Sequence, residues 1–267
     1  MSELRVIPVE GMPEVREGNQ VGELIAERVE LVEGDIVVIS QKIVSKAEGR
    51  VRKLAEVVPS PRAHEIAERL GKEAALVELV LSESHEILRA ERVLITETHH
   101  GFVCANAGID SSNLPEDGTV CLLPKDPDAS ARRIRDELLA AGGPGVGVGG
   151  QPRGVSGDPH TRPHPVAVVI ADSFGRAWRV GQAEVAIGCA GLAPLDDWRG
   201  RRDATGRDLA ATVIAIADEV AAAADLVRAK DSKVPAVIVR GLRRYVSTED
   251  GPGAASLRRP PTEDLFR

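Results

Sequence analysis

The sequence is poor in aromatic residues and in cysteine. Phe, Trp and Tyr together make up 2% of its 267 residues, so a hydrophobic core has to be built from Val, Ile, Leu and Ala. The same scarcity leaves few rings on which nucleic-acid bases can stack. Cys104, Cys121 and Cys189 lie far apart and form no CxxC pair. This pattern argues against a disulfide framework or a cysteine-ligated zinc site and favours a reducing cytoplasm.

Long apolar runs and an excess of positive charge are also missing. No apolar segment approaches the ~18 residues that a membrane span needs, and the amino-terminal segment has no apolar run flanked by positive charge. The formal net charge is −7, which argues against a nucleic-acid-binding face. We therefore expect a cytoplasmic protein with neither a nucleic-acid nor a membrane partner.

What is present is an alternation of strand-like and helix-like segments. Short apolar runs predict strands, and 3.6-residue periodicity predicts helices. Strands are expected at 4–9, 36–39, 93–96, 119–123, 166–170 and 234–239, and helices at 21–29, 61–82, 126–141 and 209–228. We expect Asp128 to cap the third of these helices. The order predicts a mixed α/β (α+β) fold over residues 1–267.

Two segments differ in composition from the rest of the chain. Residues 142–165 contain eight Gly and five Pro among 24 residues. Such a segment buries little apolar area, so we expect a flexible insertion or a link between lobes. Residues 247–267 form a polar tail that we expect to fray.

Three clusters of polar residues follow apolar strands, where ligands of α/β sheets commonly bind. The first comprises Ser40, Gln41 and Lys46, which offer hydrogen bonds and a positive charge for a phosphate. The second includes Asp110 and Asn113, and Asp110 is a candidate ligand of a hard cation such as Mg²⁺. Residue spacing alone favours solvated turns for both clusters.

The third cluster contains Asp172 and Ser173, followed by Arg176 and Arg179. A carboxylate beside a hydroxyl suits a divalent cation, and the arginines are candidates to hold a substrate phosphate or carboxylate. A helix cap at Asp172 is an equally good explanation.

Other catalytic motifs are absent. The glycine run at 145–150 lacks the GK[ST] ending of a P-loop, His99 and His100 lack HExxH spacing, and no GxSxG elbow is present.

Taken together, long ordered strings of the chain resemble one family, the coenzyme F-420:L-glutamate ligases, which are the γ-glutamyl ligases of F-420 biosynthesis. The strings are VVISQKIVSKAEGR (37–50), GFVCANAGIDSSN (101–113), LLPKDPDASARRIR (122–135), ADSFGRAWRVGQAEVAIGCAGL (171–192), ADEVAAAADLV (217–227) and PAVIVRGL (235–242). They cover nearly the whole chain except 142–165 and the tail.

The resemblance implies a chemistry and an assembly. GTP phosphorylates the carboxylate of the F-420 precursor, a deazaflavin, and the amine of L-glutamate then displaces the phosphate. A second glutamate follows through a γ-link. Two Mg²⁺ or Mn²⁺ ions are expected at each site, with K⁺ as an activator. A two-lobed fold and an intertwined homodimer are implied as well.

The resemblance also assigns residues. Asp110 and Asp172 match the ligands of one metal ion, and Ser173 matches a hydroxyl that binds the other. Residues that match nucleotide contacts are Met12, Pro13, Glu14, Val15, Ser40, Gln41, Lys46 and Asn113, with the stretch 228–234.

The chain departs from the family at two places that bear on this assignment. Family members usually read GQTDVAIG where this chain has Ala183 and Glu184, and Lys230 stands where some relatives have a group able to bind the second metal ion. Two other functions remain open: a metal-dependent nucleotide hydrolase, and a deazaflavin-binding protein without catalytic activity.

Overall fold

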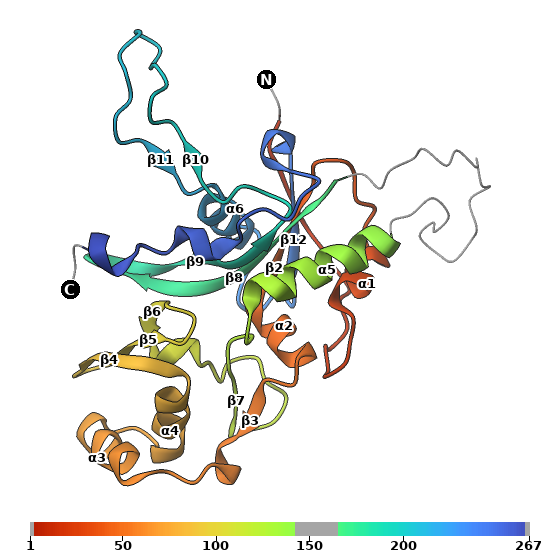
Figure 1. The fold of residues 1–267 in the computed structure, drawn as a ribbon. Coiled ribbons are helices and arrows are strands. Elements are labelled where there is room, and N and C mark those ends of the chain that lie inside the picture. Colours follow the sequence, from red (N-terminus) through yellow and green to blue (C-terminus); the bar gives the residue numbers. More distant parts are fainter. Residues whose placement is uncertain (1–2, 142–164, 265–267) are drawn as a thin grey trace.

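A five-stranded mixed sheet forms the centre of the molecule, shown in Figure 1, a computed structural model that describes residues 3–141 and 165–264. The strands lie in the order β1-β12-β2-β8-β9. β2 and β8 run parallel, and the other neighbours are antiparallel. The bounds are β1 (Arg5–Pro8), β12 (Ala236–Arg240), β2 (Ile36–Ser40), β8 (Ala167–Arg176) and β9 (Arg179–Ala190).

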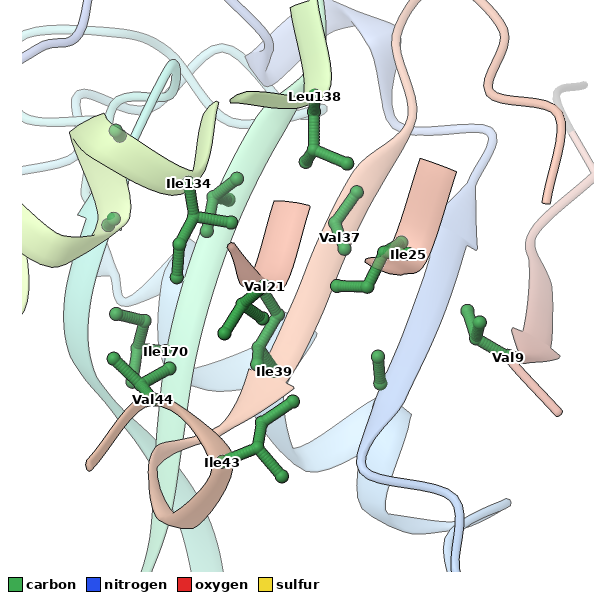
Figure 2. Close-up of a cluster of buried hydrophobic side chains, with 14 of the residues drawn as sticks. Val9, Val21, Ile25, Val37, Ile39, Ile43, Val44, Ile134, Leu138 and Ile170 are labelled. Atoms are coloured by element: carbon green, nitrogen blue, oxygen red, sulfur yellow. The ribbon is translucent and has the colours of Figure 1, made fainter. Parts of the chain in front are cut away.

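The apolar run of β2 is buried on both faces of this sheet because helices cover each face. Val37 and Ile39 contribute to a cluster under α1 (Val21–Ala26), α2 (Gln41–Ala47) and α5 (Pro127–Ala141), shown in Figure 2. Ile36 and Val38 point the other way and pack under α6 (Ile216–Asp225). Aliphatic side chains thus fill both interfaces, as the scarcity of aromatic residues predicted.

A second group of elements has a hydrophobic cluster of its own beside the central sheet (Figure 1). A three-stranded antiparallel sheet of β4 (Ser84–Ala90), β5 (Leu94–Thr98) and β6 (Val103–Ala105) packs with α3 (Pro61–Leu70) and α4 (Ala74–Ser82). β3 (Val51–Lys53) pairs with β7 (Thr119–Cys121). Together with the central sheet, these elements confirm the predicted mixed α/β class.

The remaining short elements lie in the connections. They are β10 (Asp196–Asp197) with β11 (Val213–Ile214), and the 3-10 turns η1 (Leu54–Glu56), η2 (Asn106–Gly108), η3 (Arg243–Tyr245), η4 (Ala254–Leu257) and η5 (Pro261–Glu263). Within the two described stretches of chain, none of these helices combines the length and apolar character needed to cross a membrane.

The helix predicted at 61–82 is wrong, because the segment forms two helices. Gly71 ends α3 in the left-handed conformation, with φ 63° and ψ 38°, and α4 begins at Ala74. A glycine carries no Cβ to oppose this conformation, so it stops the helix where periodicity alone suggests continuation. The helix predicted at 209–228 is also shorter, because α6 begins at Ile216.

Asp128 is not the cap of α5, contrary to the sequence-based expectation. Asp126 takes that role, since its Oδ1 accepts the Ala129 N–H at 2.9 Å. The Asp128 carboxylate instead accepts the backbone N–H groups of Cys189, Ala254 and Ala255 at 2.9, 2.7 and 3.1 Å. It therefore ties β9 and η4 to the start of α5.

Arg135 of α5 contacts the beginning of the polar tail, and the fraying of residues 247–267 stays a prediction. The Arg135 side chain is 5% exposed and pairs with Asp250 at 2.8 Å. Its guanidinium also donates to the carbonyl oxygens of Val166, Ser247 and Thr248. The predicted flexible segment at 142–165 lies outside the described residues except for Pro165.

Replacing Arg135 with methionine is expected to lower the free energy of unfolding by about 2–3 kcal/mol, because the buried Val166 carbonyl oxygen and two partly buried carbonyl oxygens of the tail lose their donor. Urea denaturation measures the change. Arg202→Met is the control, since Arg202 is 75% exposed in its ion pair with Asp208 and such pairs contribute at most about 1 kcal/mol. Equal stability of the two variants would contradict the anchoring role of Arg135.

Candidate functional site

A cavity of about 1070 Å³ opens where the parallel strands β2 and β8 both approach their carboxyl-terminal ends. Ser40, the last residue of β2, pairs with Ala171, so Asp172 and Ser173 follow directly at the same edge. The lining includes all the single residues that the sequence assigned to a metal ion or to the nucleotide: Met12, Pro13, Glu14, Val15, Ser40, Gln41, Lys46, Asp110, Asn113, Asp172 and Ser173. It also includes the predicted stretch 228–234 except Ser232.

Arg176 and Arg179 lie elsewhere. They pair across the turn between β8 and β9, and neither belongs to the cavity lining. β8 is also longer than predicted, since it continues through Asp172 to Arg176. The alternative interpretation of Asp172 as a helix cap is therefore wrong.

One wall of the cavity carries a lysine and an unpaired amide donor on α2. Lys46 Nζ donates to Glu14 Oε1 at 2.6 Å and to the Asn113 carbonyl oxygen at 3.1 Å. Gln41 is 1% exposed, and its Nε2 has no hydrogen-bond partner in the described part of the chain. A buried donor of this kind is costly unless a ligand or water accepts a hydrogen bond from it. This wall of the cavity therefore suits an oxygen-rich ligand.

Lys42 lines the cavity but was not among the site residues that the sequence predicted. Its Nζ donates to Asp110 Oδ2 at 2.7 Å, to the Ser112 carbonyl oxygen at 2.7 Å and to Ser112 Oγ at 2.8 Å. Burial acts to raise the pKa of Asp110, but hydrogen bonds from Lys42 and Ser112 outweigh it and hold the pKa below its usual range. Asp110 therefore stays ionised at the cavity wall.

The pKa of Asp172 is shifted in the opposite direction from that of Asp110. Burial, the nearby Glu184 carboxylate and the charge of Asp110 raise the pKa of Asp172 to about 7. Asp110 and Asp172 lie far apart in the sequence, yet both line the cavity and the charge of Asp110 acts on Asp172. A cation between them would relieve this repulsion.

A further set of charges surrounds Ser173. Its hydroxyl donates to Glu184 Oε1 at 2.5 Å and accepts from Lys230 Nζ at 2.8 Å. Arg228 Nη2 lies 2.7 Å from Glu184 Oε2, and the two side chains are 9% and 5% exposed. The sequence interpretation noted Glu184 and Lys230 as departures from the family but did not identify the Arg228–Glu184 pair.

The donor set fits one hard cation of the type that nucleotide-binding enzymes use. In the described residues, no three His, Cys, Asp or Glu side chains gather in the way that an all-protein metal site requires. Mg²⁺ commonly takes one or two carboxylates and completes its shell with water and phosphate oxygens. Asp110 and Asp172 supply such a pair of carboxylates in one cavity.

Comparison with known proteins covers nearly the whole chain. A sequence model of the family described as F420-0:Gamma-glutamyl ligase matches residues 11–164 and 159–241. A coenzyme F420:L-glutamate ligase of Methanothermobacter thermautotrophicus is 45% identical over 99% of this chain and 99% of its own length. Ligases with the same name from Methanopyrus kandleri and Methanocaldococcus jannaschii are 43% and 38% identical, over 99% and 100% of this chain and 98% and 99% of their own lengths. The chain therefore belongs to the F420-0:gamma-glutamyl ligase family and is a ligase.

Proposed function

We propose that this ligase uses GTP to join L-glutamate to the carboxylate of the coenzyme F420 precursor. The observation that carries the proposal is the convergence of Asp110, Asp172 and the predicted nucleotide-contacting residues on one cavity. The relatives reported above, which are named coenzyme F420:L-glutamate ligases, support the choice of substrates.

In the first step, an oxygen of the precursor carboxylate attacks the γ-phosphorus of GTP, the bond to the bridging oxygen breaks, and GDP leaves. Phosphoryl transfer of this kind needs positioning and charge stabilisation more than covalent help from the protein. Lys46 supplies positive charge for the phosphates, and the Gln41 amide is a free donor on the same wall. Asp110 and Asp172 would hold Mg²⁺ or Mn²⁺, which would stabilise negative charge on the phosphate oxygens.

In the second step, the amine of L-glutamate attacks the acyl carbon, an amide bond forms, and inorganic phosphate leaves. The amine must be neutral when it attacks, so a group nearby has to accept its proton. A second GTP would then phosphorylate the γ-carboxylate of the newly added glutamate. Attack by the amine of a second L-glutamate on that acyl phosphate would give the γ-glutamyl link. Exclusion of water from the acyl phosphate favours the amine over hydrolysis.

We also propose that the chain works as a homodimer and that K⁺ activates it, as the resemblance implies. Light scattering coupled to size-exclusion chromatography tests the first point, and a mass equal to a single chain at working concentration would reject it. Comparison of rates in KCl and in a tetramethylammonium salt tests the second, with a higher rate expected in KCl.

The proposed reaction has a direct test. The protein is incubated with GTP, Mn²⁺, L-glutamate and the deglutamylated F420 precursor, and mass spectrometry follows the precursor. Addition of glutamate together with release of GDP and phosphate in equal amounts is expected. An unmodified precursor, under conditions in which one of the relatives adds glutamate, would rule the proposal out.

Two further results would identify the other functions that remained open at the sequence level. Loss of GTP at an equal rate with and without precursor and glutamate would identify a nucleotide hydrolase. Binding of the deazaflavin without binding of GTP, measured by isothermal titration calorimetry, would identify a deazaflavin-binding protein.

A further inference from the structure

The ammonium group of Lys230 occupies the side of the cavity where the Ser173 hydroxyl lies, with Nζ and Oγ 2.8 Å apart. We propose that this ammonium group takes the place of a second metal ion, so that the chain holds a single divalent cation beside its nucleotide. This inference rests on the proposed function, because it concerns the charges that face the phosphates of GTP.

The hydrogen bonds of Ser173 leave little room for a metal ion at its oxygen. A serine hydroxyl has one proton and two lone pairs. The Ser173 hydroxyl donates its hydrogen bond to Glu184 Oε1, and one of its lone pairs accepts a hydrogen bond from Lys230 Nζ. A cation at Ser173 Oγ would have to approach within about 2–2.5 Å of this neutral oxygen, and at that distance it would meet the positive charge of Lys230.

Both carboxylate oxygens of Glu184 already face a partner: Oε1 accepts from Ser173, and Oε2, which accepts no hydrogen bond in the described residues, faces a positive charge. Arg228 lies against its second oxygen at 2.7 Å, and both side chains are almost fully buried. Arg228 and Lys230 therefore place two positive charges around Ser173 and Glu184, which is the charge that one divalent cation would contribute. Because these two charges belong to the side chains of the protein, they are always present and repel a mobile cation from the same place.

The side of the cavity that holds Asp110 and Asp172 differs in this respect. Lys42 contacts Asp110, but two carboxylates, those of Asp110 and Asp172, line the cavity there. Carboxylate oxygens have several lone pairs, so Asp110 can bind Lys42 and a cation together. One divalent cation is therefore favoured at the carboxylates and disfavoured at Ser173.

Lys230 is also anchored beside the predicted nucleotide contacts. Asn113 Nδ2 donates to the Lys230 carbonyl oxygen at 3.4 Å, and both residues line the cavity. An ammonium group has three protons to donate, so the exposed Lys230 side chain can contact a phosphate oxygen while it keeps its hydrogen bond to Ser173. Arg228 remains with Glu184 in that arrangement.

The test counts bound Mn²⁺ rather than activity. Mn²⁺ binding to the full chain is titrated in the presence of saturating GDP, with electron paramagnetic resonance reporting free Mn²⁺. The wild type is expected to bind a single Mn²⁺ per chain. Lys230→Gln, which removes the charge and adds an amide oxygen that can act as a ligand, is expected to bind a second.

Lys125→Gln is the matched control, because Lys125 is exposed and does not line the cavity; it should bind Mn²⁺ as the wild type does. Two Mn²⁺ ions per wild-type chain, none at all, or an unchanged count in Lys230→Gln would each overturn the inference. Glutamate addition is measured separately on the same samples. A chain that binds a single Mn²⁺ but adds no glutamate would reject the proposed function and leave the Mn²⁺ count as it stands.

Discussion

Replacing Asp110 with asparagine is expected to slow glutamate addition by about 10³-fold, which corresponds to about 4 kcal/mol of transition-state stabilisation. The substitution removes the negative charge of one of the two carboxylates that would hold the cation, and the phosphate charge then lacks its counterion. Asparagine has nearly the same shape as aspartate and keeps one acceptor oxygen, so Lys42 and the Ser112 hydroxyl can retain their acceptor while the Ser112 backbone N–H loses its own.

The stability of the fold should change little in this variant. The Asp110 side chain is 46% exposed in its ion pair with Lys42, and pairs this accessible to solvent contribute at most about 1 kcal/mol. Steady-state kinetics and urea denaturation would be measured on the same preparation. A variant with the wild-type rate and wild-type stability would show that Asp110 holds no catalytic cation.

Glu116→Gln provides the matched control for this experiment. Glu116 lies in the same connection between β6 and β7, pairs with the exposed Lys53, and does not line the cavity. The change again converts a carboxylate into an amide. It should leave both the rate and the affinity for Mn²⁺ unchanged, so a loss confined to Asp110→Asn reports the position and not the loss of charge.

The strands of the central sheet were predictable because their apolar runs are continuous. Ile36 to Ile39 are buried on both faces of the sheet. A short run of four β-branched residues favours a strand over a helix. The length of β8 was not predictable in this way. Beyond Ile170 its residues are polar or small apart from Phe174, and the strand continues because β9 pairs with it as far as Arg176.

The candidate site likewise has features that the sequence predicted and features that only the folded structure shows. The motifs around Ser40 and Asp172 predicted that these segments meet, because polar residues after parallel strands share one edge of the sheet. Asp110 follows the antiparallel strand β6, so only the family resemblance placed it with them. The pairing of Lys42 with Asp110 and of Arg228 with Glu184 depends on tertiary contacts between distant segments. No local pattern encodes such a pair, since a lysine one turn before Lys46 is equally compatible with a solvated helix face.

Replacing Lys46 with methionine is expected to weaken binding of GTP and GDP by about 10–100-fold, since a charged hydrogen bond to a phosphate contributes about 1.5–3 kcal/mol. Methionine retains a long apolar side chain, which matters because the Lys46 side chain is 9% exposed and its stem is packed against its neighbours. Isothermal titration calorimetry with GDP and Mn²⁺ measures the affinity.

The structure gives this prediction a second, independent readout. Without nucleotide, Lys46 pairs with Glu14 at 2.6 Å, so a phosphate has to compete with a carboxylate for the same ammonium group. Added salt screens both the carboxylate and the phosphate, but only the wild type has a charge at this position to screen. At constant KCl, the affinity of wild type for GDP should therefore fall more steeply with the concentration of a tetramethylammonium salt than that of Lys46→Met. Lys53→Met, which removes an exposed lysine outside the cavity, should keep the wild-type affinity and salt dependence. Equal affinity and equal salt dependence in wild type and Lys46→Met would place the phosphates elsewhere in the cavity.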